Sequence, residues 1–184
     1  MDTSDPEISF DDNGLCNHCR VFFNVTSKNW FPNEQGHRRL KSILDRVKAK
    51  GIGKRYDCAL GLSGGADSCY LAIKAYEWGL RPLVIHVDTG WNSDMSVSNV
   101  ERIVNHCGFE LHTEVIDWEE MKDLQLAYLR SGVSNQDVPQ DHAIFASIYK
   151  YSIQNGIRCI LSGGNTASES IFPRAWHGNA MDSI

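Results

Sequence analysis

The stretch YDCALGLSGGADSCYLA, residues 56–72, passes from an apolar run through a glycine-rich turn into a second apolar segment. Residues 57–63 form a short, mainly apolar run, which is typical of a buried strand. The apolar residues that follow recur at helical spacing until Gly79, a residue that ends helices. Serines, glycines and one aspartate separate the two segments. The stretch therefore predicts a strand, a tight polar loop and a helix in direct succession.

The rest of the chain repeats this alternation of strand and helix. Further strands are predicted at 82–90, 109–117 and 157–165, and further helices at 93–107, 118–131 and 142–155. Strands that alternate with helices favour a doubly wound parallel sheet with helices on both faces. The expected fold is therefore α/β and Rossmann-like.

Three polar motifs each follow a predicted strand: SGGADS at 63–68, DTGWN at 88–92 and SGGN at 162–165. Right-handed crossovers bring the carboxyl ends of parallel strands to one edge of the sheet. Ligands of such sheets bind along that edge, near the point where the strand order reverses. We therefore expect the three motifs to meet there and to form a binding site.

The first motif has the chemistry of a phosphate-binding loop. A strand-to-helix loop presents free backbone N–H groups and the positive end of a helix dipole. Gly64 and Gly65 allow an oxyanion to approach the main chain, and the hydroxyls of Ser63 and Ser68 add donors. Asp67 alone would repel a phosphate, but magnesium is commonly held between a carboxylate and phosphate oxygens. The motif therefore predicts binding of a polyphosphate together with Mg²⁺.

Two common nucleotide-binding motifs do not fit this loop. The P-loop needs a lysine directly before Ser or Thr, and Asp67 stands in that place. The glycine spacing of the dinucleotide fingerprint is also different. A glycine turn with capping serines is the purely structural alternative, and the combination Ser-Gly-Gly-x-Asp-Ser is more specific than such a turn requires.

SGGADS resembles the signature loop of the PP-loop ATP pyrophosphatases, which cleave ATP between the α- and β-phosphates. The resemblance implies that the loop holds the pyrophosphate part of ATP and that a substrate oxygen becomes adenylated. It also implies adenosine contacts at the end of the second strand and at the last one. The implied ATP-binding residues are Ser63, Gly64, Gly65, Asp67, Ser68, His86, Val87, Asp88 and Gly163.

Longer segments are similar to the N-acetyl sugar amidotransferases of lipopolysaccharide O-antigen synthesis. They are FDDNGLCNHCR, DTGWNSDMSVSNVERIV, DWEEMKDLQLAYLRSGV, DHAIFASIYK and ILSGGNTASESIFPRAW. The resemblance implies that an acetamido group of a nucleotide-linked sugar becomes an acetamidino group. Ammonia is expected from a glutaminase partner, with a cyclase-like subunit. The implied catalytic residues are Ser63, Asp67 and Asp141, and the implied substrate contacts are His142, Asn165 and Arg174.

Several of these residues also have a structural interpretation. Asp141 and His142 fit an N-cap aspartate and a surface histidine at the start of a helix. His86, inside a buried strand, fits a core histidine with satisfied hydrogen bonds. Trp91 and Trp176 fit either packing or stacking on a sugar or base. These alternatives stay open from the sequence.

Residues 1–34 depart from the alternating pattern and predict a small irregular lead-in before a PP-loop domain at 35–184. Cys16 and Cys19 form a CxxC pair, which is half of a four-cysteine zinc site. A second cysteine pair usually precedes this position in the resembling family, and a long segment usually follows FPRAW. We therefore expect the domain to be incomplete at its C-terminus, and zinc as a further cofactor only if more ligands complete the site.

Composition narrows the class of protein. The formal charge of −5 argues against a broad nucleic-acid surface, and the basic residues between Arg38 and Arg55 fit the solvated face of a helix. No run is apolar enough to cross a bilayer, and the sequence has no basic start followed by an apolar block that would indicate a signal peptide, so we expect a cytoplasmic protein. The alternative functions are a tRNA-thiolating PP-loop enzyme and a non-catalytic nucleotide-binding remnant. The sequence does not predict an oligomeric state.

Overall fold

The computed structural model describes residues 1–133, 135–164, 173 and 176. The chain divides into two compact units, one formed by 1–43, 132–135 and 165–184 and the other by 44–131 and 136–164. The expected boundary at residue 34 coincides with the start of α3, and the separate domains stay a prediction. The elements of the second unit, with the helix that leads into it, are α3 Glu34–Lys50, β1 Cys58–Gly61, α4 Ala66–Glu77, β2 Pro82–Asp88, α5 Asp94–Cys107, β3 Glu110–Val115, α6 Trp118–Ser131, α7 Val138–Gln154 and β4 Ile160–Leu161.

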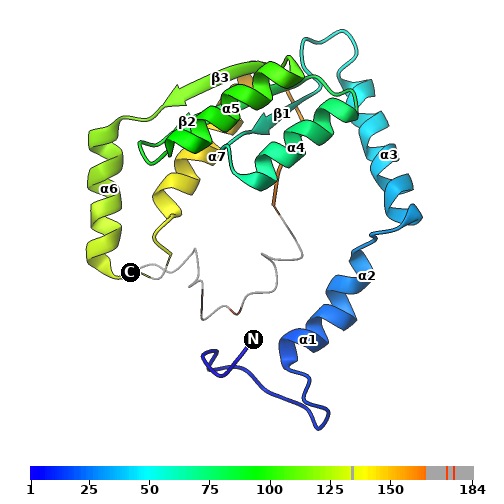
Figure 1. The fold of residues 1–184 in the computed structure, drawn as a ribbon, viewed down its shortest axis with the longest axis vertical. Helices are drawn as coiled ribbons and strands as arrows, with labels where there is room; N and C mark the ends of the chain where they lie inside the picture. Colours follow the sequence, from blue (N-terminus) through cyan, green and yellow to red (C-terminus); the bar gives the residue numbers. More distant parts are fainter. Residues whose placement is uncertain (134, 165–172, 174–175, 177–184) are drawn as a thin grey trace. The chain divides into compact units, whose positions relative to one another are not determined.

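The four strands form one parallel sheet in the order β3-β2-β1-β4, of which Figure 1 labels β1, β2 and β3. Chain order runs outward from β1 to β3 on one side and then returns to place β4 on the other side of β1. The order therefore reverses between β1 and β4, which is where ligands bind in open α/β sheets. The doubly wound α/β fold expected from the sequence is confirmed.

Both faces of the sheet are covered, because successive strand residues point to opposite sides. Leu60 of β1 and Val84 of β2 pack against α3, α4 and α5. Ala59, Leu83 and Ile85 face the other way, against Ile148 of α7. Because both faces of these strands are buried, the sequences of β1 and β2 are almost continuously apolar.

The last helix of the second unit begins earlier than the sequence indicates. We expect a polar loop through Asp141, but α7 starts at Val138, with Asp137 in the capping position and Pro139 in its first turn. Proline is tolerated there because the first helical N–H groups have no partner within the helix. Asp141 is consequently not the N-cap, and its backbone N–H donates to Asp137 O at 2.9 Å.

The N-terminal segment is irregular only in its first part. Residues 1–16 form turns closed by one antiparallel bridge between Phe10 and Cys16. A helical segment follows: α1 Asn17–Val21, the π-helical turn η1 Phe22–Thr26, and α2 Ser27–Asn29. The sequence gives little helical periodicity there, since the side chains of this segment stay largely exposed.

No helix among the described residues is long and apolar enough to cross a membrane.

Candidate functional site

The loop between β1 and α4 is held by its own serines. Ser68 Oγ donates to Gly65 O at 3.1 Å and accepts from Ser63 N at 3.2 Å. Because the single Ser68 proton is used in that way, Ser63 Oγ is the donor in the 3.0 Å contact between the two hydroxyls. Gly65 N in turn donates to Ser63 Oγ at 3.3 Å. The hydroxyls thus shape the loop without any ligand.

Gly64 is buried at the centre of this loop, where only a glycine fits. Its φ of +81° lies in the left-handed region, and a Cβ would lie 2.1 Å from the backbone oxygen of Ser96. Asn99 on α5 donates from Nδ2 to Gly64 O at 3.0 Å. The start of α5 therefore supports the loop from behind and fixes its curvature.

The open side of the loop carries unpaired donors and one carboxylate. Ala66, Asp67 and Ser68 are the first residues of α4, and no side chain caps their N–H groups. Gly163, after β4, lies against the same turn, since its Cβ would meet Ser68 N at 3.4 Å. The exposed Asp67 is the acidic residue of this first turn. Backbone donors and a carboxylate thus converge at the strand-order reversal.

The donor set around Asp67 suits a magnesium ion shared with a polyphosphate. Among the described residues, no group of three or more His, Cys, Asp or Glu side chains could hold a metal ion by itself. Magnesium is typically held by one or two carboxylates plus phosphate oxygens and water, so a lone carboxylate beside a phosphate loop fits it. Asp67 would hold such an ion, which would neutralise phosphate charge there.

His86 lies beneath the loop as part of a hydrogen-bond chain. It is buried, and its Nδ1 donates to Leu62 O at 2.8 Å, because a carbonyl can only accept. Nε2 is then the acceptor for Asn92 Nδ2 at 3.4 Å, and the same amide nitrogen donates to Asp88 Oδ1 at 3.0 Å. Both ring nitrogens are engaged, which agrees with the core interpretation of His86. The chain of bonds ties the end of β2 to the start of the loop.

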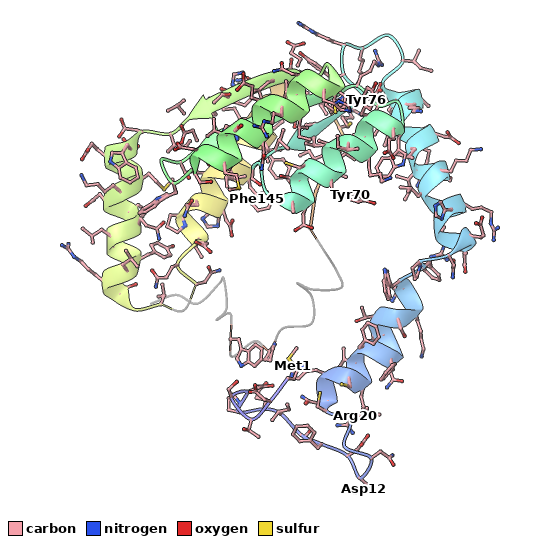
Figure 2. All side chains as sticks on the ribbon, viewed as in Figure 1. Met1, Asp12, Arg20, Tyr70, Tyr76 and Phe145 are labelled. Atoms are coloured by element: carbon pink, nitrogen blue, oxygen red, sulfur yellow. The ribbon has the colours of Figure 1, made fainter. Side chains whose placement is uncertain are left out.

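A cavity of about 190 Å³ opens beside the loop, on the α7 face of the sheet. Its apolar lining comes from β1, β2, α7 and β4, and Phe145, labelled in Figure 2, belongs to it. The lining residues are Gly61, Leu62, Ser63, Ile85, Val87, Ile144, Phe145, Ile148, Ile160, Leu161, Ser162 and Gly163. Of the predicted ATP-binding residues, Ser63, Val87 and Gly163 line this cavity, whereas His86 and Asp88 do not.

The start of α7 is attached to the same edge of the sheet. Thr89, which follows β2 and is buried, donates from Oγ1 to Gln140 Oε1 at 3.0 Å. Asp141 and His142 come next and are exposed. Partial desolvation, followed by the charge of Asp137, raises the pKa of the Asp141 carboxyl, and His142 offsets part of that shift. The expected catalytic aspartate therefore lies in the turn of α7 before the cavity-lining Ile144.

Three further residues were expected near the site: Asn165, Arg174 and Trp91. Asn165 and Arg174, the implied substrate contacts after β4, lie outside the described residues. Trp91 is exposed at the end of the β2 loop.

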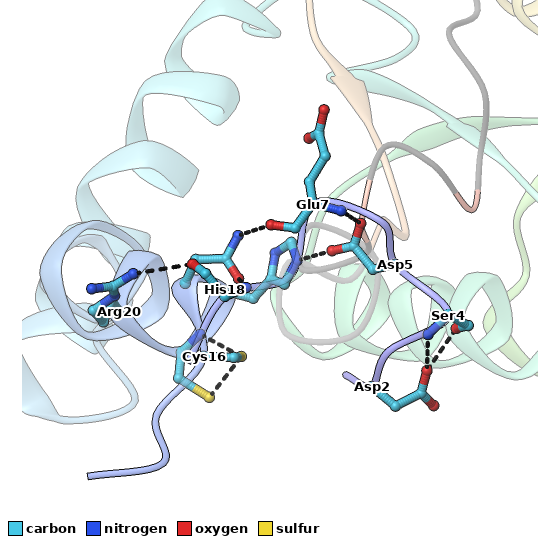
Figure 3. A network of polar contacts seen from close by, with 10 residues as sticks. Asp2, Ser4, Asp5, Glu7, Cys16, His18 and Arg20 are labelled. Atoms are coloured by element: carbon cyan, nitrogen blue, oxygen red, sulfur yellow. Dashed lines mark hydrogen bonds and ion pairs between the residues drawn. The ribbon is translucent and has the colours of Figure 1, made fainter. Parts of the chain in front are cut away.

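Cys16 and Cys19 are brought together, with their Sγ atoms 3.5 Å apart (Figure 3). The Cys19 backbone N–H donates to Cys16 Sγ, which lowers the pKa of the Cys16 thiol despite its burial. His18 turns to Asp5 instead, with Nε2 and Oδ2 at 2.6 Å. The described residues supply no third ligand. Zinc binding therefore stays a prediction from the cysteine spacing.

Solved structures with the same fold were found. An NH3-dependent NAD synthetase from Campylobacter jejuni, in complex with nitrate, has a TM-score of 0.50 at 16% identity, over 69% of this chain and 56% of that one. An NMN synthetase from Francisella tularensis has a TM-score of 0.50 at 18% identity, over 68% and 53%. A glutamine-dependent NAD+ synthetase from Acinetobacter baumannii, in complex with ADP, has a TM-score of 0.54 at 24% identity, over 70% and 24%.

The matched region thus covers only about a quarter to a little over half of each of these proteins. No protein-family model matches the sequence, and no curated protein matches it. At these identities the likeness concerns the fold. The chain has the Rossmann-like α/β fold of the NAD synthetases.

If the loop binds ATP as the sequence predicts, Gly64→Ala should weaken that binding at least about 10-fold, because the new methyl group would displace the loop from Ser96 and strain a left-handed residue. Isothermal titration with ATP and Mg²⁺ measures the effect. Gly156→Ala is the matched control: its φ is +62°, but a Cβ would meet nothing within 4 Å. Equal ATP affinity in both variants would show that the loop does not bind the nucleotide.

Proposed function

We propose that this chain is an ATP-dependent, AMP-forming amidotransferase that converts an acetamido group of a nucleotide-linked sugar to an acetamidino group. The observation that carries the proposal is the Ser63–Ser68 loop, whose unpaired backbone donors and carboxylate lie at the strand-order reversal beside an apolar cavity. A polyphosphate that ends in a purine nucleoside matches such a pair of subsites. The identity of the acceptor is inferred from the sequence likeness to sugar amidotransferases.

In this proposal the ATP lies across β1. Its β- and γ-phosphates are held by the N–H groups of Ala66, Asp67 and Ser68, and Asp67 holds the magnesium ion. The ribose and adenine enter the apolar cavity, against Val87 and Gly163. His86 supports the loop through Leu62 rather than touching the base. The α-phosphate then faces the open edge of the sheet, where an acceptor can reach it.

The chemistry proceeds in two displacements. The amide oxygen of the acetamido group attacks the α-phosphorus, pyrophosphate leaves, and the amide oxygen now carries AMP. Ammonia attacks the former carbonyl carbon, a proton is lost, and the C–O bond breaks to release AMP and leave the amidine. Asp141 accepts that proton, because its raised pKa makes the carboxylate a stronger base. Most of the rate enhancement comes from positioning and charge stabilisation, without a protein nucleophile.

Ammonia reaches the site from a partner. We propose a glutaminase subunit with a cyclase-like subunit, as implied by the sequence likeness. Two neighbours of the same fold are by name an NH3-dependent and a glutamine-dependent synthetase, which supports the use of ammonia on this scaffold. Free ammonium salt should replace the partner in vitro. Arg174 and Asn165 complete the acceptor site in this proposal, with His142.

The four cysteines of the sheet unit do not fit the thiolating alternative, which needs reactive thiols. Cys16, whose thiol pKa is lowered, belongs with Cys19 to the other unit. Burial raises the pKa of Cys58 to about 12. Burial also raises the pKa values of Cys69, Cys107 and Cys159. A sulfur carrier needs a lowered thiol pKa and access to its partner. Cys58, Cys69 and Cys159 pack in the core of the sheet unit, and Cys107 is buried.

Pyrophosphate release by the purified protein tests the proposal. With ATP and Mg²⁺, we expect release of pyrophosphate and AMP only when both an acetamido sugar nucleotide and ammonium are present, and mass spectrometry of the sugar should show replacement of oxygen by an NH group. ATP binding without turnover under these conditions, glutaminase partners included, would leave only a nucleotide-binding protein. Tight, salt-sensitive binding of tRNA would instead favour the thiolating function.

A further inference from the structure

Two exposed tryptophans form a pair at the carboxyl edge of the sheet, outside the features used so far. Trp91 follows β2 and Trp118 opens α6, directly after β3. Their ring centroids are 5.5 Å apart, with the planes 68° from each other. Trp91 is 54% exposed and Trp118 is 40% exposed. Two exposed indoles side by side offer an apolar surface on which a ligand ring can stack.

The structure builds this pair rather than leaving it loose. Gly90 has a φ of +84°, and a Cβ there would lie 2.3 Å from Trp118 Cε3, so the indole lies directly on the glycine backbone. Asp88 Oδ1 accepts from Gly90 N at 2.9 Å and from Asn92 Nδ2 at 3.0 Å. The turn that carries Trp91 is thus fixed on both sides of the indole.

The pair belongs to a different part of the sheet edge from most of the apolar cavity. The cavity is lined by β1, β2, β4 and α7, whereas Trp91 and Trp118 follow the carboxyl ends of β2 and β3. The turn of Trp91 adjoins the loop, because the neighbouring Asn92 contacts His86, and His86 donates to Leu62 O. In the proposed reaction the acceptor amide must meet the α-phosphorus, so the ring that bears this amide would lie next to the loop.

The residues that flank the two tryptophans in sequence are mostly acidic, although one of them, Glu119, pairs with Lys122 at 2.9 Å. Glu119 and Glu120 occupy the first turn of α6, and Asp117 Oδ1 accepts from Glu120 N at its start. Asp94 occupies the first turn of α5, close in sequence to Trp91. Carboxylates repel a diphosphate but accept hydrogen bonds from hydroxyl groups. Indole faces pack against the C–H face of a pyranose ring.

We propose that Trp91 and Trp118 form the acceptor subsite, in which Trp91 stacks on the pyranose ring that bears the acetamido group. This inference rests on the proposed function for the identity of the acceptor. The stacked ring leaves its amide oxygen pointing toward the phosphate loop, while the nucleotide part of the acceptor extends away from the carboxylates. Trp91 is then a specificity-determining residue for the sugar, and it has no role in holding ATP.

Tryptophan fluorescence of the whole chain tests the subsite without turnover. The probes are N-acetylglucosamine, its UDP conjugate, and UDP alone. We expect the two sugar-containing probes to change the emission, and UDP alone to leave it unchanged. Trp91→Phe should remove this change. Trp30→Phe, which replaces a tryptophan of similar exposure in the other unit, should keep it.

Steady-state kinetics provide the second measurement. Trp91→Ala should raise the KM for the acceptor about 10-fold, with kcat and the KM for ATP changed less than about 2-fold. Trp91→Phe should recover part of the loss, which a merely structural role would not predict. An unchanged acceptor KM in an active Trp91→Ala enzyme overturns the subsite and leaves the proposed function intact. A fluorescence response to UDP but not to N-acetylglucosamine overturns it too, because the base would then be the stacked group.

Failure of the proposed reaction can be told apart from failure of the subsite. Sugar-dependent emission from Trp91 in a protein that releases no AMP would support the subsite and refute the amidotransferase reaction.

Discussion

Asp67→Ala should reduce pyrophosphate release at saturating magnesium by at least about 100-fold. The physical reason is the sign of the charges. The carboxylate is exposed in the first turn of α4, where the backbone donors attract phosphate and the carboxylate repels it. Beside a bound phosphate, an acid in that place is favourable only if a cation lies between the two, and without the carboxylate that cation loses its protein ligand.

Asp67→Asn provides a sharper version of the same test, because it keeps the size of the side chain and removes the charge. With magnesium present, the variant should bind ATP more weakly than the wild-type protein. With EDTA present, the order should invert, since the wild-type carboxylate then repels the bare triphosphate. Isothermal titration under both conditions measures the two affinities.

Glu77→Ala is the matched control for Asp67. Glu77 is the last residue of the same helix and pairs with Lys74 at 2.7 Å, far along α4 from the loop. Its loss should leave ATP affinity and turnover unchanged. If Asp67 served only the helix dipole, its replacement would lower stability by about 0.3–1 kcal/mol and leave turnover intact. Full turnover in Asp67→Ala would therefore remove the assigned role.

The sheet and the phosphate loop could be predicted because their signals are local. An apolar run, two glycines and two serines occur within a few residues. The left-handed φ at position 64 also favours a glycine for local reasons. The alternation of elements then places β1, β2 and β4 by general rules of handedness. The engaged ring of His86 agrees with one of the two interpretations that the sequence left open for a histidine inside a buried strand.

The supports of the loop and the second half of the site could not be predicted, since they depend on side chains that meet only in the fold. Asn99 bonds Gly64 O from an ordinary helical position. Trp118 faces Trp91 across two strand ends that are 27 residues apart in the chain. The early start of α7 was hidden because Pro139 and the polar residues around it also fit a loop. None of these positions carries a sequence pattern of its own.

Arg81→Ala should lower the free energy of unfolding by about 3 kcal/mol, the largest stability effect expected in the chain. Asp57, before β1, has a side chain only 3% exposed, and its carboxylate accepts from the Arg81 backbone N–H, Nε and Nη2. Arg81 also donates to Lys54 O at 2.8 Å and Gly51 O at 2.9 Å. Removal of the guanidinium leaves a buried carboxylate without its charge partner and the 51–57 turn without its clamp. Urea unfolding measures the loss.

Arg55→Ala separates this effect from the loss of any arginine at the same edge of the sheet. Arg55 pairs with Glu110 at 2.7 Å, but both side chains are well exposed, at 74% and 46%, so the variant should lose less than about 1 kcal/mol. The double variant Asp57→Ala with Arg81→Ala should be more stable than Arg81→Ala alone, because no buried charge is then left unpaired. A double variant as unstable as the sum of the two single variants would mean that the clamp on the turn, rather than the buried charge, holds β1 in register. Because both residues lie at the amino ends of the strands, the folded fraction of each variant should keep its ATP affinity.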